Sequence, residues 1–491
     1  MRKIINSQMQ IGETDISKIE FDLRSRDEIP KLLMGLQHIY SNIKIRKKVF
    51  KILEGIVPKN IDTNNGCPGM DLWKILVMGT LRLNCNWDFD KLHEIVNNHK
   101  TVRQMLGHNI INDNKLYPLN TIKDNIVLFT PEILEKISKL VVDTGHDYVG
   151  HKKNESLKGR CDSFVVETNV HYPTDINLLF DAIRKTIKLT GCACSAVGIT
   201  SWRKSEYNIR TIKKSFNKVR KLKRSTSKNP DKKAQKEKQI IQAHQDYIDL
   251  VKTSLVKVES TLQLLDEQYK YNQEKIQQIE DYKKHTDRQI DQIKRRVVFA
   301  EIIPHNEKVF SIFEEHTEWI SKGKAGVPQE LGIRVCVLED QYGFVLHHDV
   351  MEKKTDDKIA VPMTKIAKKK FPNLDSCSYD TGFYTPENKI ELNKLLDFTV
   401  LPKKGKLSKQ DKELEYSEEF IEKRRQHPAV ESGINALENH GLDRCPDHGI
   451  DGFKRYVALA VLARNLQKLG HLIQQIELQR YKHQEKSRLA A

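Results

Sequence analysis

The chain has 491 residues, which is enough for two to four domains with at least one sizeable core. No apolar run has the length of a membrane-spanning helix, and the first residues lack the apolar segment of a secretory signal, so we expect neither feature. The formal net charge of +17 favours a polyanionic partner, nucleic acid first, over a merely basic and inert surface.

The eight cysteines are scattered along the chain and match no zinc-binding or redox spacing. The adjacent pair in "GCAC" lacks the two-residue spacer of a chelating or redox motif. We therefore expect the cysteines to be reduced thiols of a cytoplasmic protein, most of them small residues in its core.

Residues from about 20 to 145 have helical periodicity. In "DLWKILVMGTLRLN" the apolar residues recur at helical spacing, Asp71 occupies the N-cap position, and a Gly-Pro-Gly break precedes it. "PEILEKISKLVVDTG" predicts another amphipathic helix. Residues 1–150 are thus expected to form a compact helical domain.

The next segment, "GRCDSFVVETNVHYPTD" over residues 159–175, alternates as a strand does. Alternation places Asp162 on the same face as Phe164 and Val166, where an uncompensated carboxylate would cost several kcal/mol. The following "INLLFDAIRKTIKL" predicts a helix with Asp175 at its N-cap. Thr174 and Asp175 are interpreted as cap residues rather than as support for an active-site loop.

No glycine occurs between Gly198 and Gly323, and apolar residues from Ile241 to Ile293 follow an interleaved heptad pattern. With "STSKNP" as the break, this predicts an antiparallel helical hairpin whose tip lies near Pro230. Whether the seam packs within one chain or between two chains is left open.

The first arm and tip of this hairpin are strongly basic: residues 203–238 contain fifteen Lys or Arg against three acids. This density is typical of an arm that contacts phosphates, and a solvated helix face is the alternative. The candidate DNA contacts here are Lys213, Lys214, Lys218, Arg220, Lys221, Lys223 and Arg224.

Strands return after residue 326. "LGIRVCVLEDQYGFVLHHDVM" predicts two strands joined by a tight turn, and "VPMTKIAKKKFPN" predicts a helix. A strand, loop and helix follow in "LDSCSYDTGFYTPENKIELNKLL", then a strand in "DFTVLPKKGK" and further helices. The fold class is therefore an α/β core with a mixed sheet, and the helical stretch is an all-α insertion between its first and second strands.

Three acids occupy positions that a catalytic metal site could use: Asp162 on the first strand, Asp380 at the end of a later strand and Glu431 on a late helix. Carboxylates that converge would repel one another unless cations neutralise them, and Mg²⁺ or Mn²⁺ suits such oxygen ligands. Two such ions would assist a phosphodiester displacement. Each acid also has an ordinary alternative as a cap, a turn residue or a solvent-facing side chain.

Four stretches together resemble transposases of bacterial insertion sequences, in the DDE superfamily with an RNase H-like core. They are "CDSFVVETNVHYPTD", "EWISKGKAGVPQELG", "YDTGFYTPEN" and "HPAVESGINALENHGLDRCPDHGIDGFKRYVALAVLARNLQKLG". "GCPGMDLWKILVMGTLRLNCNWDFDKLHEIVNNHKTVRQMLG" resembles the helical N-terminal domain of such proteins.

The resemblance implies that Asp162, Asp380 and Glu431 are both the catalytic residues and the ligands of two Mg²⁺ or Mn²⁺ ions. It implies hydrolysis at the ends of a mobile element, followed by attack of the freed 3′-hydroxyl on target DNA. The implied partners are double-stranded DNA with terminal inverted repeats and further copies of the chain, as a dimer or higher oligomer, without a membrane. The implied location is the bacterial cytoplasm at the nucleoid.

The assignment of the glutamate leaves an alternative, because Glu438 lies seven positions after Glu431 on the same helix face. Some related transposases carry a tyrosine, an arginine and a lysine at offsets that fall here on Arg424, His427 and Glu438, so that signature is absent. Further phosphate contacts are predicted for Arg424 and Arg425 and for Lys322 and Lys324, where a solvated turn is the alternative for the two lysines.

The expected domains are a helical DNA-binding domain (1–150), the RNase H-like core (155–175 and 326–470), the helical insertion (176–325) and a helical tail (471–491). Three other functions remain open from sequence: an inactive or domesticated DNA-binding relative, a coiled-coil scaffold, and a metal-dependent nuclease without strand transfer.

Overall fold

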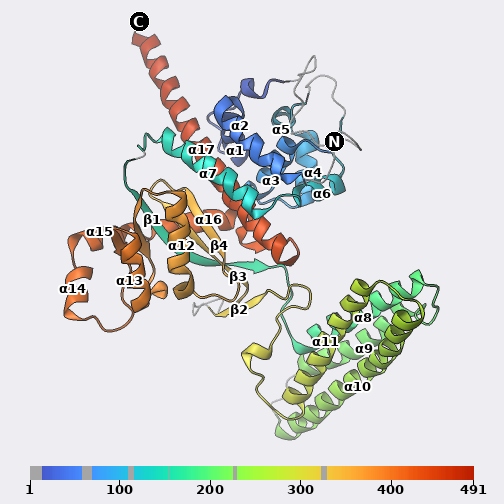
Figure 1. Ribbon diagram of the computed structural model, residues 1–491. Coiled ribbons are helices and arrows are strands. Elements are labelled where there is room, and N and C mark those ends of the chain that lie inside the picture. Colours follow the sequence, from blue (N-terminus) through green and yellow to red (C-terminus); the bar gives the residue numbers. More distant parts are fainter. Residues whose placement is uncertain are drawn as a thin grey trace. The chain divides into compact units, whose positions relative to one another are not determined.

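The computed structural model describes residues 14–57, 69–108, 115–152, 154–224, 229–321 and 329–490. It divides into two compact units, one of residues 1–169 with 320–491 and the other of residues 170–319. The first unit holds helices and a mixed sheet, and the second is helical (Figure 1). None of the helices in the described ranges is both long and apolar enough to cross a membrane.

The first unit begins with a helical array, as the periodicity predicts. Its described helices are α1 (Glu28–Ser41), α2 (Ile43–Leu53), α3 (Leu72–Asn84), α4 (Phe89–Asn98), α5 (Lys100–Met105), α6 (Leu119–Ile126) and α7 (Pro131–Tyr148), with 3₁₀ turns at Ile16–Lys18 and Glu54–Ile56. Side-chain caps at Asp27, Asn42, Asp88 and Thr130 accept otherwise unpaired backbone N–H groups. Asp71 is the N-cap residue of α3 as predicted, but its carboxylate pairs with Lys74 instead of a backbone N–H.

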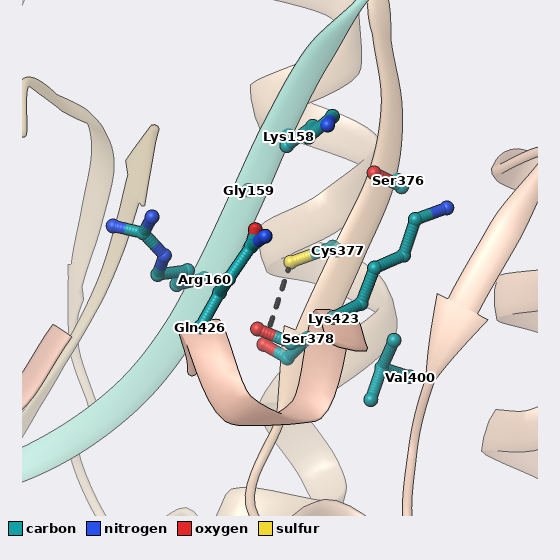
Figure 2. Close-up of a pocket in the computed structure, with 9 residues that line it drawn as sticks. All are labelled: Lys158, Gly159, Arg160, Ser376, Cys377, Ser378, Val400, Lys423 and Gln426. Atoms are coloured by element: carbon teal, nitrogen blue, oxygen red, sulfur yellow. Dashed lines mark hydrogen bonds between the residues drawn. The ribbon is translucent and has the colours of Figure 1, made fainter. Parts of the chain in front are cut away.

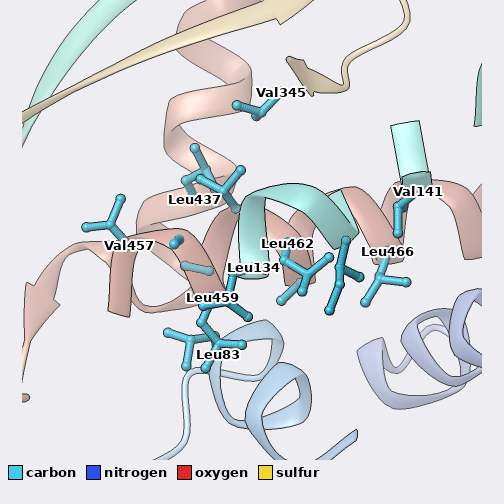
Figure 3. Packing of buried hydrophobic residues seen from close by; sticks show 14 of the residues in the cluster. Leu83, Leu134, Val141, Val345, Leu437, Val457, Leu459, Leu462 and Leu466 are labelled. Carbon is cyan, nitrogen blue, oxygen red and sulfur yellow. The ribbon is translucent and has the colours of Figure 1, made fainter. Parts of the chain in front are cut away.

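The long helix α17 (Gly449–Ala490) joins this array to the sheet. Figure 3 shows its apolar side chains packed against those of α3 and α7, among them Leu83, Leu134, Val141, Leu459, Leu462 and Leu466. These residues belong to one hydrophobic cluster that also contains residues of the sheet. The functional domain boundaries inferred from the sequence stay a prediction.

The described sheet has seven strands: β1 (Leu157–Thr168), β2 (Glu318–Ser321), β3 (Gln329–Asp340), β4 (Val345–Val350), β5 (Leu374–Tyr379), β6 (Phe398–Val400) and β7 (Arg444–Cys445). Its main order is β2-β3-β1-β5-β6, with β4 paired to β3 and β7 paired to β1. β3 runs antiparallel to β1 and β4, whereas β5 runs parallel to β1 and β6. The mixed sheet and the predicted hairpin of β3 and β4 are thus confirmed.

Helices cover both faces of this sheet. On one face α12 (Asp356–Lys370) contacts β5 through Thr364, whose hydroxyl lies 2.5 Å from that of Tyr379. The preceding residue, Ser378, points to the opposite face because side chains alternate along a strand. Its hydroxyl lies 2.9 Å from Nδ1 of His427, between α15 (Glu418–Gln426) and α16 (Ala429–Leu437). The remaining described helices are α13 (Pro386–Leu395), α14 (Lys409–Glu415), and the turns Thr381–Phe383 and η6 (Glu438–Leu442).

The second unit lies in the sequence between β1 and β2 and contains α8 (Asp175–Ala196), α9 (Ser205–Arg224), α10 (Pro230–Gln263) and α11 (Gln273–Val297), with a short turn at His305–Glu307. Figure 1 shows the four helices side by side as a bundle. Most predicted seam residues are buried in its core, including Ile248, Val251, Leu255, Val258, Ile279 and Ile293. Heptad spacing therefore identified the buried face.

The predicted continuous seam from Ile241 to Ile293 is wrong. A π-helical turn at Leu264–Gln268 ends α10, Lys270 adopts a left-handed φ of 44°, and Asn272 caps the start of α11. Tyr269, assigned to the seam, lies in this turn and is 41% exposed. The chain thus makes a second reversal here, and the seam packs within one chain against α8 and α9.

The cap interpretation is confirmed for Thr174, whereas the assignment of Asp175 as the N-cap of α8 is wrong by one residue. Thr174 is the N-cap, and its hydroxyl accepts a hydrogen bond from the Asn177 N–H at 3.3 Å. Asp175 is the first helical residue, and its carboxylate pairs with Arg296 at 2.6 Å instead. Both residues are adjacent in the sequence and both are good caps, so spacing alone does not separate them.

Candidate active site

Asp162 lies on β1, and Asp380 directly follows β5, the parallel neighbour of β1. The register of β1 and β5 pairs Cys161 with Tyr379, so the next residues along both strands are Asp162 and Asp380. Neighbouring strands lie about 4.8 Å apart, and residues in register on parallel strands point to the same face. The fold therefore brings Asp162 and Asp380 together although 217 positions separate them in the numbering.

Electrostatics identify the other members of this group, which we call the carboxylate cluster: Asp162, Asp380, Glu431 and Asp356. Burial first, and then the charges of Asp380, Asp356 and Glu431, raise the pKa of Asp162 to about 6. A hydrogen bond from the Ser163 N–H to Oδ1 of Asp162, at 2.7 Å, opposes the rise. The protein itself thus compensates the Asp162 charge only in part.

Glu431 lies in the first turn of α16 and is exposed. Its charge acts on both Asp162 and His427, whereas Glu438, in the turn η6, is not among the main charges acting on either group. The charge of Glu431 thus reaches Asp162, and the choice of Glu431 over Glu438 as the third acid stays a prediction.

Asp356 was missed by the sequence analysis. It opens α12, and its Oδ1 accepts a hydrogen bond from the Ser163 hydroxyl at 2.6 Å, which fixes it beside β1. In "EKKTDDKIAVP" it looks like an ordinary acid in the first turn of a helix. Only the packing of α12 against the sheet brings this carboxylate near enough to Asp162 for its charge to raise the Asp162 pKa.

His427 lies next to the carboxylate cluster. In the sequence analysis it was noted only as a position where some related transposases carry a different residue. Burial lowers the pKa of His427, while the nearby charges of Asp380 and Glu431 oppose this effect. Its Nδ1 lies 2.9 Å from the Ser378 hydroxyl on β5. This contact attaches the start of α16, and with it Glu431, to the strand that leads to Asp380.

Cationic side chains flank the cluster. Figure 2 shows Lys158, Arg160 and Lys423 around a water-sized cavity of about 20 Å³ between β1, β5 and α15. Arg424 and Arg425 are exposed in the last turn of α15, and the Arg424 charge lowers the pKa of His427. Both predicted arginines therefore lie on α15, the helix that precedes α16 and its Glu431. Lys322 and Lys324 lie outside the described residues.

The predicted basic arm coincides with α9. Its apolar face (Ile209, Ile212, Phe216 and Val219) is buried in the bundle, and all seven predicted DNA contacts are exposed. One of them, Lys218, pairs with Asp246 at 3.2 Å, and both side chains are well exposed. Because such a surface pair is weak, the arm keeps most of its positive charge available.

The donor chemistry of the carboxylate cluster fits a hard divalent cation. Hard cations prefer carboxylate oxygens, and an ion there would relieve the repulsion that raises the Asp162 pKa. Within the described ranges, however, no group of three or more His, Cys, Asp or Glu is arranged closely enough to hold an ion as it stands. Asp380 and Glu431 are both exposed, so packing does not hold their side chains in one rotamer.

Comparison of the chain with protein-family models, with curated proteins and with solved structures finds no match. The geometry of the site and the resemblance of the sequence motifs are therefore what supports a function for this chain.

Proposed function

We propose that the chain is a DNA transposase of the DDE superfamily. The observation that carries the proposal is that Asp162 and Asp380 directly follow the paired residues Cys161 and Tyr379 of two parallel strands, with Glu431 close enough to affect the Asp162 pKa. The proposed RNase H-like character of the core is supported by a sheet in which antiparallel β4, β3 and β1 continue into parallel β5 and β6.

In this proposal Asp162, Asp380 and Glu431 bind two Mg²⁺ or Mn²⁺ ions, and Asp356 adds a fourth carboxylate beside them. Bound ions of this kind supply an activated water and neutralise charge on the scissile phosphate. The protein contributes position: Ser163 fixes Asp356, and the Ser378–His427 contact fixes the start of α16. The product 3′-hydroxyl would then attack target DNA, without a covalent protein–DNA intermediate.

The basic residues have a separate task in the proposal. Arg424, Arg425 and the exposed cations of α9 would contact backbone phosphates, which hold DNA in place without reading its sequence. The helical array before β1 would recognise terminal inverted repeats. Joining two element ends requires at least two copies of the chain, so we propose a dimer or higher oligomer on DNA at the bacterial nucleoid.

The test is cleavage of DNA that carries the element end, with Mg²⁺ present and the full-length protein. Asp162→Asn and Asp380→Asn are each expected to lower the cleavage rate by about 100-fold or more, because each removes charge that stabilises the transition state. Binding of the same DNA should persist, since neither residue contacts DNA through positive charge.

The matched control is Asp375→Asn, which changes an aspartate of the same strand, β5, that lies near Lys368 at 4.0 Å. Wild-type cleavage in this variant and undiminished cleavage in the other two would exclude the proposed ligands. Cleavage by the wild type without joining to target DNA would instead indicate a nuclease.

A further inference from the structure

A second cluster of charged residues in the first unit is independent of the carboxylate cluster. It lines a cavity of about 360 Å³ formed by α1, η6 and α17. The lining contains the cations Lys31, Arg464 and Lys468 and the histidines His440 and His471. Among the described residues of this lining, Glu28 is the one carboxylate. We call this cavity the α17 cavity.

The positive charge of this cavity is incompletely paired. Nε of Arg464 is buried without a hydrogen-bond partner, while Nη1 donates to Oε1 of Gln467 at 2.9 Å. Within the described part of the chain no hydrogen bond or ion pair engages the Lys468 ammonium. Burial lowers the pKa of both Arg464 and Lys468, which shows that both charges are partly removed from water.

The nearby acids do not compensate this charge. Glu28 already pairs with Lys31 at 3.2 Å and accepts a hydrogen bond from Gln467. Glu339 acts on both Arg464 and Lys468, but burial raises its pKa to about 7, so it carries only part of a charge near neutral pH. Asp340 also acts on Lys468, but its Oδ2 lies 2.6 Å from Nε2 of His146. Unpaired cations that lose water need an anionic partner, because their burial is otherwise costly.

We propose that the α17 cavity binds a phosphate group, carried either by a DNA backbone or by a small phosphate ligand. The Arg464 guanidinium offers a planar fork of donors and Lys468 a point charge, a combination suited to phosphate oxygens. The volume is in the range of small-ligand sites and far exceeds that of a single water. The proposal stands whether or not the carboxylate cluster is catalytic.

The experiment measures two probes on the full-length protein: inorganic pyrophosphate by isothermal titration calorimetry, and a short labelled DNA duplex by fluorescence anisotropy. Lys468→Gln and His471→Gln are each expected to weaken binding of at least one probe, by about tenfold for Lys468→Gln, because a charge-assisted contact is lost. The control is Lys482→Gln, an exposed lysine on the same helix fourteen positions further along, outside the cavity.

Loss of pyrophosphate binding with unchanged duplex affinity supports a small phosphate ligand, and the reverse pattern supports a DNA phosphate. Loss of both pyrophosphate binding and duplex binding supports a site that accepts a phosphate from either a small ligand or DNA. If Lys468→Gln and His471→Gln bind both probes as Lys482→Gln does, the proposal is overturned. Asp162→Asn should retain binding in the α17 cavity, so failure of the transposase proposal would be visible separately.

Discussion

Asp162 illustrates, at the level of one residue, how a partly buried carboxylate reduces the stability of its own fold. Its pKa is raised from 3.8 to about 6, so the folded state holds a proton more tightly than the unfolded state does. Above pH 6 the ionised carboxylate therefore costs folding free energy, at most about 3 kcal/mol from the size of the shift. The cost disappears as the pH falls towards 3.8.

The first prediction follows from this sign. In metal-free buffer at pH 7, Asp162→Asn is expected to raise the thermal unfolding midpoint by a few degrees, because it removes a charge that repels Asp380 and Glu431. Adding Mg²⁺ should stabilise the wild type more than the variant. Differential scanning calorimetry with and without Mg²⁺ measures both effects, with Asp375→Asn as the control. A variant less stable than the wild type in metal-free buffer would contradict the argument.

Glu339 gives a second prediction at this scale. It is buried on β3, 3.7 Å from Arg160, and its pKa is raised from 4.5 to about 7. Stability should therefore fall as the pH rises from about 4.5 through 7, by at most about 3 kcal/mol. Glu339→Gln is expected to flatten this fall in urea unfolding measured across that pH range. The exposed Glu54→Gln is the control, and parallel curves for wild type and Glu339→Gln would refute the prediction.

The sequence predicted part of the site for a physical reason. Asp162 stood out because a carboxylate on the apolar face of a strand is costly, and Asp380 because its motif resembles that of a known family. Asp356 and the Ser378–His427 contact did not, because each residue has an ordinary local explanation as a cap, a strand residue or a helix-terminal residue. Their roles arise from contacts between elements distant in the sequence, which local patterns do not encode.

At the level of elements, the crossing of α1 and α17 depends on two glycines. A Cβ on Gly470 would lie 1.7 Å from the Lys31 carbonyl oxygen, and one on Gly35 would lie 2.4 Å from that of Leu466. Both contacts are with backbone atoms, so neither can be relieved by a rotamer change. The close approach also sets the positions of Lys31 and Lys468 in the α17 cavity.

Gly470→Ala is accordingly expected to destabilise the protein by about 3 kcal/mol or more, because the two helices must separate to admit a methyl group. Gly55→Ala is the matched control, since the nearest atom to its added Cβ is 4.0 Å away, and it should be close to neutral. Unfolding midpoints in guanidinium chloride measure the difference. Equal midpoints for the two variants would show that the helices can move apart at little cost.

The helical bundle shows what periodicity can and cannot predict. The spacing of Ile248, Val251 and Leu255 identified a buried face, because a 3-4 repeat keeps one side of a helix apolar. The reversal at Lys270 was missed, because neither glycine nor proline marks it and the heptad count continues across it. The caps at Thr174 and Asn272 are the local signals that fix these helix starts.

At the level of the whole molecule, positive charge is concentrated on α9, and its proposed role can be tested through salt. The double variant Lys213→Gln/Lys221→Gln is expected to weaken DNA binding and to lower the slope of log affinity against log salt by about 2, since each phosphate contact contributes about 0.9. The matched control, Lys275→Gln/Lys284→Gln on α11, lowers net charge equally at exposed positions of the same bundle. Equal slopes for the two double variants would show that only net charge matters.

The position of the bundle in the chain has a consequence for synthesis. β1 pairs with β3 along most of its length, yet all of residues 170–319 are made between these two strands. At ribosomal rates this interval lasts on the order of ten seconds, far longer than a bundle of local contacts needs to form. The four helices should therefore be complete while the newly made β1 still lacks its partner β3, so its unpaired edge stays open to aggregation or to a chaperone during that interval.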